Sequence, residues 1–284
     1  MDISCISKYP VAAFFILTFI ISWGAILAIF GTDGIPATTD LQEQIGMAIL
    51  LGPAIASLLL IMIFDGTKGI RQLGTRLIRW RANVKWYAVA LLTAPLSTLV
   101  CLLALSFFVT DHHPAIFNSS DVSSVLLLGI IGGLTVGLFE EIGWTGFAIP
   151  RLIKRFNIYA TGAIVGILWG AWHFILFWEN DSFVKTIPFF LLLARLFAWL
   201  PAYRIIMVWV YDHTRSLLIV VLMHASLVAS LATLDPIIQG KDLLFYILIR
   251  ATVLWIFVGI IAMNRKTRKR NDKADAGDYP LAEN

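Results

Sequence analysis

The sequence predicts an all-α, polytopic membrane protein with about eight transmembrane helices and both termini in the cytoplasm. Four observations point to this class. Of the 284 residues, 59% are hydrophobic and only 14% are charged, whereas soluble domains are nearer half apolar and a quarter charged. The mean hydropathy is +0.83. The apolar residues form runs of about 20, the length that spans a bilayer, and the basic residues gather in alternate connections.

Each apolar run is long enough to cross the hydrocarbon core as a helix. The first run is longer than the core of a secretory leader and has no small-residue cleavage site after it, so we expect a retained helix. Boundaries read from sequence are uncertain by about 2 to 4 residues. The runs occupy 11–30, 45–64, 86–109, 122–144, 158–177, 187–210, 217–234 and 243–263.

The orientation follows from the 22 Lys and Arg residues, because cytoplasmic connections carry the excess of positive charge. One set of alternate connections holds almost all of them. The opposite set holds only Lys185 and Lys241, and Arg195, Arg204 and Arg250 fall inside apolar runs. Both termini are therefore predicted to be cytoplasmic. These basic residues flank membrane helices, where orientation and anionic lipid explain them, so we expect no nucleic-acid partner.

The chain shows no internal repeat and no linker that would join two domains. We expect a single transmembrane domain over 1–264, followed by a basic, disordered cytoplasmic tail over 265–284, because that tail is polar and highly charged. Cys5 and Cys101 are the only cysteines, which excludes a disulfide scaffold. As a hypothesis, we place this multi-pass protein in a bacterial inner (plasma) membrane, since no eukaryotic sorting signal is visible.

Few ionisable residues lie within the apolar runs, and each raises a functional hypothesis, since burying one costs at least about 2.5 to 3.5 kcal/mol. Glu140 and Glu141 lie in LFEEIGWTGF, His173 in ILWGAWHFILFW and His224 in IVVLMHASLVAS. Each of these residues also has a purely structural explanation. The two glutamates could reach water from a helix end, His173 could be a buried, hydrogen-bonded histidine, and His224 could make a polar packing contact. For His224, the structural explanation and a catalytic role are nearly equally favoured.

Antiparallel pairing of the fourth and fifth runs would place Glu140 and His173 at the same depth. Their midpoint falls at Phe156 and Asn157, so each lies roughly 16 residues, or about 25 Å of helix, from the turn. Glycines repeat every fourth residue in both runs and predict close packing between them. His224 lies shallower in its run, which requires that the seventh helix begin near Tyr211 or that the cavity slope. The glycines are Gly129, Gly133 and Gly137 in one run and Gly162, Gly166 and Gly170 in the other.

Carboxylates and imidazoles in a hydrated cavity within the membrane can activate water for hydrolysis. A glutamate can act alone as the general base, or a divalent metal such as zinc can take part, held by Glu140, His173 and His224. The residues leave both possibilities open. A histidine can orient the water or bear the developing oxyanion.

The three motifs resemble those of the CPBP (Abi) family of intramembrane endopeptidases, the CAAX-processing and bacteriocin-processing family that includes proteins similar to lysostaphin resistance protein A. The resemblance covers roughly 122–234 and rests on the Glu-Glu pair, the Trp-Gly-Ala-Trp-His segment and the later His-Ala-Ser. It implies a glutamate-dependent peptidase with a cavity open to the cytoplasm. Carried over by position, Glu140 would activate water, Glu141 would support it, and His173 and His224 would complete the catalytic site. The implied partners are the lipid bilayer and a membrane-associated peptide or prenylated protein.

Two positions depart from the family pattern. Thr145 stands where the first motif usually has arginine, and Val228 stands where the third usually has asparagine or another small polar residue. A missing cation leaves a costly buried charge unless another compensates, for which Arg195, Arg204 and Arg250 are candidates. A missing oxyanion donor typically costs about 10² to 10³ in rate; Ser226 or Ser230 could substitute only from another helix face.

These departures keep a second hypothesis open: a catalytically weak or inactive relative that acts as a membrane binding or immunity protein. A third hypothesis, a small transporter that uses the two glutamates as a proton relay, requires broken helices and pseudo-repeats. The sequence shows neither, so this hypothesis ranks last.

Overall fold

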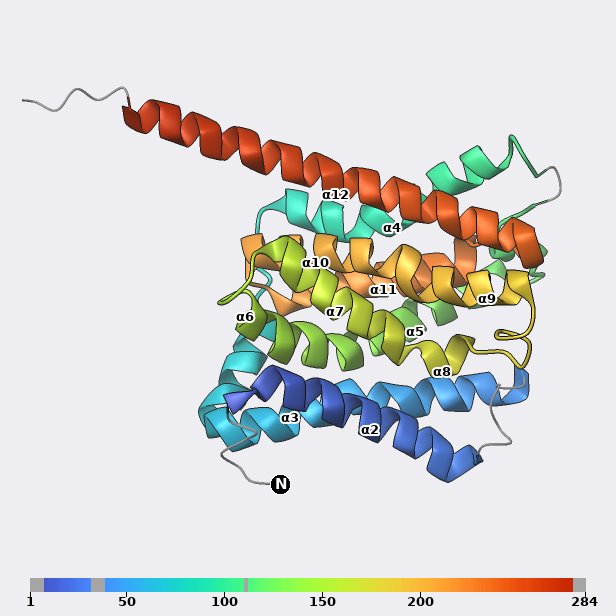
Figure 1. Ribbon diagram of the computed structural model, residues 1–284, viewed down its shortest axis with the longest axis horizontal. Helices are drawn as coiled ribbons and strands as arrows, with labels where there is room; N and C mark the ends of the chain where they lie inside the picture. Colours follow the sequence, from blue (N-terminus) through green and yellow to red (C-terminus); the bar gives the residue numbers. More distant parts are fainter. Residues whose placement is uncertain (1–7, 32–38, 110–111, 278–284) are drawn as a thin grey trace, which may run out of the picture.

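The computed structural model describes residues 8–31, 39–109 and 112–277, and within them the regular structure is helical (Figure 1). The all-α class is thus confirmed. The elements are α2 (Pro10–Phe30), α3 (Thr39–Leu77), α4 (Val84–Leu105), the 3₁₀ turn η1 (Ala115–Asn118), α5 (Val122–Gly143), the π-helix η2 (Trp144–Ala148), α6 (Ile149–Leu152), α7 (Ile158–Trp172), α8 (Phe174–Phe177), α9 (Thr186–Leu193), the π-helix η3 (Ala194–Ala198), α10 (Leu200–Thr214), α11 (Leu217–Leu234) and α12 (Gly240–Gly277).

Short polar side chains start several of these helices. Asp121, Asn157 and Ser216 each accept a hydrogen bond from the backbone N–H three residues on, the usual way to satisfy a free donor in the first turn. At Asp121 the Ser124 hydroxyl also donates to the carboxylate, and these bonds hold the pKa of that carboxyl below its ordinary value. The caps fix where α5, α7 and α11 enter the bundle.

Seven helical segments of the described chain are long and apolar enough to cross a membrane, so the polytopic class is confirmed. The fifth apolar run differs from the prediction. Its helix, α7, ends at Trp172 after 15 residues, or about 22 Å of rise, because the chain turns at His173 into the single turn of α8. The sixth run is longer than predicted: α9, η3 and α10 together form a span from Thr186 to Thr214.

The helices that carry the two glycine stripes, α5 and α7, each pack closely against one partner helix. α5 packs closely against α11, and α7 against α10. A Cβ on Gly137 would lie 2.8 Å from the Val221 carbonyl oxygen of α11, and one on Gly162 would lie 2.5 Å from the Cα of Ile205 in α10. The prediction that the two stripes face each other is therefore wrong. The stripe of α5 allows the backbone of α11 to come close, and the stripe of α7 allows that of α10 to do so. Small residues permit such close approach whichever helix lies opposite.

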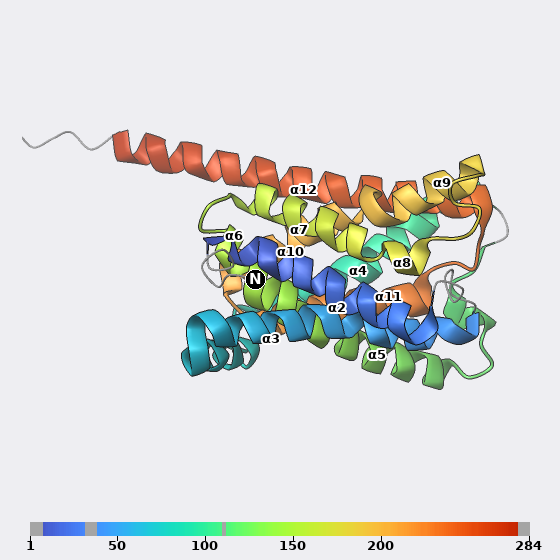
Figure 2. The ribbon, with the colours of Figure 1, turned by 60° about the horizontal axis from the view of Figure 1, so that its bottom comes forward.

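In Figure 1, α2 and α3 form one side of the bundle, α4 and α12 form the opposite side, and α5, α7, α10 and α11 lie between them. The start of α2, the turn after α6 and the far end of α12 lie at the same end, which we call the basic end. Here α3 bends at Gly66, whose φ of +59° suits glycine, and Figure 2 shows this bend.

The backbone of α12 is helical as far as Gly277, past the point where the sequence analysis places the start of a disordered tail. Residues 278–284 lie outside the described chain. The division into a membrane domain and a tail, and the cytoplasmic location of the termini, stay predictions.

Candidate active site

The two glutamates lie at the junction of α5 and the π-helix η2. Their side chains are buried, with relative exposures of 2% for Glu140 and 0% for Glu141. A π-helix carries an extra residue per turn and often marks a functional site. Here it begins at Trp144, three residues after Glu141, and contributes Trp144 and Thr145, each four residues after the carboxylate to which it donates a hydrogen bond.

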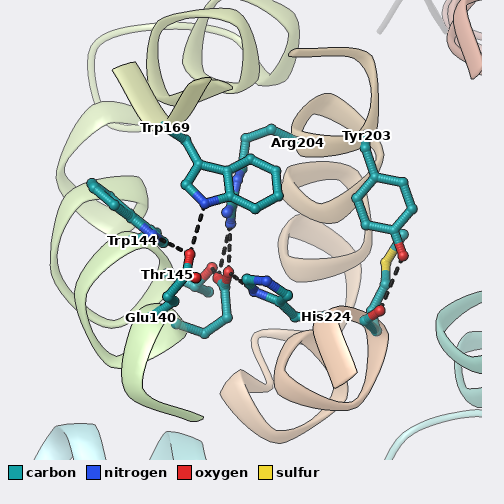
Figure 3. Close-up of polar contacts among 9 residues, drawn as sticks. Glu140, Trp144, Thr145, Trp169, Tyr203, Arg204 and His224 are labelled. Carbon is teal, nitrogen blue, oxygen red and sulfur yellow. Dashed lines mark hydrogen bonds and ion pairs between the residues drawn. The ribbon is translucent and has the colours of Figure 1, made fainter. Parts of the chain in front are cut away.

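Three elements besides its own hold Glu141. Arg204 of α10 approaches both carboxylate oxygens through one guanidinium nitrogen, at 2.7 Å and 2.9 Å. His224 of α11 bonds to Oε1 through Nδ1 at 2.8 Å, and the Thr145 hydroxyl of η2 donates to Oε2. Figure 3 shows the side chains of Arg204, His224 and Thr145 pointing toward the same region. A buried carboxylate with this set of donors is paired and fixed in orientation.

Glu140 has a different environment. Its Oε2 accepts hydrogen bonds from two indoles, Trp144 Nε1 at 3.0 Å and Trp169 Nε1 at 2.7 Å, as Figure 3 shows. Its other oxygen, Oε1, has no hydrogen bond from the part of the protein that the structure describes. Within the described chain, the hydrogen bonds of this buried carboxylate are therefore confined to one of its two oxygens.

His173 lies at the C-terminus of α7, where its Nδ1 is 2.8 Å from the Trp169 carbonyl oxygen. A carbonyl only accepts, so Nδ1 carries the hydrogen, and Nε2 bears the lone pair of the neutral ring. The imidazole packs against Trp169 and Trp172, with ring centroids at 5.4 Å and 4.8 Å.

Trp169 is the centre of the arrangement. Its ring contacts His173 and His224, both with centroids at 5.4 Å, and its indole N–H donates to Glu140. The Arg204 guanidinium carbon lies 4.1 Å from the centroid of the same ring, a cation–π geometry. One indole therefore links the two histidines, the glutamate and the arginine.

Two comparisons with known proteins bear on this site. The family model described as type II CAAX prenyl endopeptidase, Rce1-like, matches residues 122–230, the segment that contributes Glu140, Glu141, His173 and His224. This segment of the chain is thus similar to the CAAX protease (CPBP) family. The CAAX prenyl protease 2 of Methanococcus maripaludis is 27% identical over 187 residues, which cover 62% of this chain and 66% of that protein. The match thus spans just under two thirds of this relative's length.

The structure brings together the four residues that the family motifs single out. Glu140 and His173 both contact Trp169, the glutamate by accepting a hydrogen bond from the indole N–H and the histidine by ring packing; the equal depth of the two residues stays a prediction. The proposed early start of the seventh helix is wrong, because α11 begins at Leu217. His224 still reaches Glu141 because the glycine face of α5 lets α11 approach closely.

The arginine that is missing from the first motif has a replacement in the structure. Among the three arginines that the sequence offers, Arg204 pairs with Glu141, whereas Arg195 pairs with Glu179 and Arg250 with Asp235. The Thr145 hydroxyl supplies a further hydrogen bond where the arginine would stand. Sequence reasoning could not choose among the arginines, because the choice depends on which helix faces α5.

No polar group replaces the missing asparagine on α11. Ser226 donates its hydroxyl to the Leu91 carbonyl of α4, away from the glutamates, and Ser230 has no hydrogen-bond partner in the described structure. Sequence reasoning also missed the indole donors of Trp144 and Trp169. A spacing of four residues from Glu140 to Trp144 was a signal for the first of them.

The proposed metal set of Glu140, His173 and His224 is not assembled as a ligand group. Within the described residues, no three His, Cys, Asp or Glu side chains come together in a way that could hold a metal ion. The Nδ1 atoms of both histidines are engaged by other groups. We therefore derive no catalytic step from a metal, and metal dependence stays a prediction.

Proposed function

We propose that the protein is an intramembrane endopeptidase that uses Glu140 to activate water. The observation that supports this most is the asymmetry of the Glu140 carboxylate. Two indoles hold Oε2, while Oε1 has no hydrogen bond within the described chain. Such a group is oriented yet free to take a proton from water, which is what a general base requires.

In the proposed reaction, Glu140 Oε1 takes one proton from a water molecule, and the resulting hydroxide adds to the carbonyl carbon of the peptide bond. The tetrahedral intermediate then collapses with loss of the C–N bond, and the proton held by Glu140 passes to the leaving amine. The products are a carboxylic acid and an amine. The indoles of Trp144 and Trp169 keep the carboxylate in place throughout.

Glu141 is proposed as a positioning residue. Its carboxylate is occupied by Arg204, Thr145 and His224, which leaves it little capacity to act as a base. By accepting from Nδ1, it fixes the ring of His224 and directs Nε2 as the reactive nitrogen, in the manner of an acid that orients a catalytic histidine.

His173 and His224 are proposed to serve the substrate through their Nε2 atoms. Both Nδ1 atoms face acceptors, a carbonyl and a carboxylate, so both rings present the other nitrogen. A protonated Nε2 can donate to the developing oxyanion, and a neutral one can orient the water. With Val228 at the asparagine position, these imidazoles are the oxyanion donors that we propose.

The proposed substrate class is a membrane-associated peptide, and in particular a prenylated one. The site lies among helices long and apolar enough to span a membrane, so a peptide that approaches along the bilayer is brought close to it. A lipid chain on the peptide would supply that approach, since each buried CH₂ contributes about 0.8 kcal/mol. The matched relative's name, CAAX prenyl protease 2, supports the same class. A plasma-membrane location is part of this proposal.

One observation favours a second candidate, a catalytically weak or inactive relative with a binding role. Val228 leaves α11 without a polar group one turn beyond His224. The other departure no longer supports this candidate, because Arg204 balances Glu141.

Cleavage of a farnesylated peptide by the purified protein tests the proposal. Glu140→Gln should lower the rate by about 10² to 10⁴-fold, the usual contribution of a general base, because it removes the proton acceptor and keeps the shape. Glu179→Gln is the matched control: Glu179 is an exposed acid paired with Arg195, and its loss should leave the rate unchanged. Equal rates for wild type and Glu140→Gln would refute the catalytic role. No cleavage by any form would favour the inactive relative.

A further inference from the structure

A cavity of about 490 Å³ opens at the basic end of the bundle, apart from the glutamates. It lies inside the bend of α3, with Asp65 before the bend and Arg76 after it. The facing wall comes from η2, α6 and the turn that follows, through Gly146, Arg151 and Lys154. Its volume is that of an ordinary small-molecule site.

The charges that line this cavity do not balance. Arg151 forms an ion pair with Asp65. Arg76 donates only to neutral groups, to the Gly146 carbonyl at 2.8 Å and to the Tyr211 hydroxyl at 3.1 Å, with a longer bond to the Gln72 carbonyl. Lys154 makes no hydrogen bond or ion pair with any residue that the structure describes. Two positive charges thus remain without a counter-ion, and the cavity favours an anion.

A second, smaller cavity of about 260 Å³ adjoins the first and shares Arg151 and Lys154 with it. Its other lining is largely apolar and includes Val11, Leu152 and Phe156. A ligand that touches both cavities would place an anionic group beside Arg76 and Lys154 and an apolar group against Val11 and Phe156. Phospholipids combine these two properties in one molecule.

The position of the cavities agrees with such a ligand. The candidate spans that contribute Pro10, Leu152 and Thr214 begin or end beside them, so the cavities lie at the level where a bilayer presents its headgroups. Basic pockets between membrane helices at this level recognise anionic headgroups. We propose that the two cavities form one binding site for an anionic phospholipid, with the phosphate between Arg76 and Lys154.

Native mass spectrometry of the full-length protein, titrated with short-chain lipids in neutral detergent, tests this site. Dihexanoyl phosphatidylglycerol should bind one strong site, and dihexanoyl phosphatidylcholine should bind it more weakly. Lys154→Gln should weaken binding of the phosphatidylglycerol about fivefold, the effect of losing one basic residue at a membrane surface. Arg71→Gln is the matched control, because Arg71 is an exposed cation on the same arm of α3 that lines neither cavity.

Phe156→Ser separates a lipid from a simple anion. It should weaken binding of the phosphatidylglycerol and leave binding of inorganic phosphate unchanged, because Phe156 lines only the apolar cavity. Any of three results would overturn the proposal: equal binding of the two lipids, equal weakening by Lys154→Gln and Arg71→Gln, or displacement of the lipid by inorganic phosphate at equal concentration. The last would identify a free-anion site. Peptidase activity enters none of these measurements.

Discussion

The charge of Glu141 is balanced by Arg204, a side chain 63 residues further along the chain. Both groups are fully buried, and breaking a buried pair by removing one partner costs far more than an exposed pair contributes. A cation that the family motif supplies from the same helix is supplied here from α10. The pair thus also ties α5 to α10.

Arg204→Met should lower the free energy of unfolding by about 3 to 5 kcal/mol, because it leaves an uncompensated buried carboxylate. Thr145→Arg in the same chain should restore part of the loss, since position 145 lies one helical turn from Glu141. Arg195→Met, at a partly exposed ion pair, is the control and should cost at most about 1 kcal/mol. Denaturant titrations in detergent measure all three. Equal losses for the two single variants would contradict this account of the pair.

Val228 offers a test of the missing oxyanion donor. Val228→Asn should raise the rate of peptide cleavage, by up to about 10²-fold, because it places an amide N–H donor one turn after His224 on α11. Val228→Ala changes the size of the side chain without adding a donor, so its rate should not rise. A cleavage rate for Val228→Asn no higher than that of Val228→Ala would contradict this prediction, and would indicate that the imidazoles of His173 and His224 already stabilise the oxyanion without an asparagine.

At the scale of the elements, the contact between α5 and α11 positions the site. The glycine stripe of α5 is a packing surface, as its spacing predicts, but its partner is α11 and not the predicted α7. The spacing of the glycines shows that one face of the helix has small residues, but it does not indicate which helix packs against that face. Because α11 comes close to Gly133 and Gly137, His224 reaches Glu141 in spite of the late start of its helix.

Gly133→Ala should destabilise the protein by about 1 to 3 kcal/mol and lower cleavage activity, because the added Cβ would meet the Ala225 carbonyl and push α11 away from Glu141. Gly132→Ala, one residue earlier, has open space for its Cβ. It should be neutral or stabilise the helix by up to about 1 kcal/mol. Thermal unfolding and peptide cleavage of both variants check this. Similar behaviour of the two would argue against close packing as the reason for the glycine.

At the scale of the whole molecule, the bundle has one basic end and one end with few basic residues. The turn after α6 lies at the basic end, and the segment before α9 lies at the opposite end (Figure 1). The excess of Lys and Arg predicts that the basic end is cytoplasmic.

Single cysteines at Arg155 and Lys185, in a chain whose own two cysteines are replaced, test the orientation. A membrane-impermeant maleimide added to intact cells should label the cysteine at position 185 and spare that at position 155. The pattern should reverse in inside-out vesicles, because the two positions lie at opposite ends of the bundle. Labelling of position 155 in intact cells would reverse the predicted orientation.

The sequence by itself determined the all-α class, the order of the apolar segments and the short list of buried ionisable residues. These are local properties. Hydropathy and residue type can be read from consecutive residues, and an ionisable residue within an apolar run can be identified without knowledge of the tertiary structure. The family motifs added the grouping of Glu140, Glu141, His173 and His224.

Only the tertiary structure decided which arginine balances Glu141, that Trp169 links both histidines to Glu140, and that α7 is a short helix packed on α10. These features depend on contacts between segments far apart in the sequence, such as the 63 residues between Glu141 and Arg204. Helical periodicity defines the faces of each helix, but the pairing of faces is settled by the packing of all the helices at once.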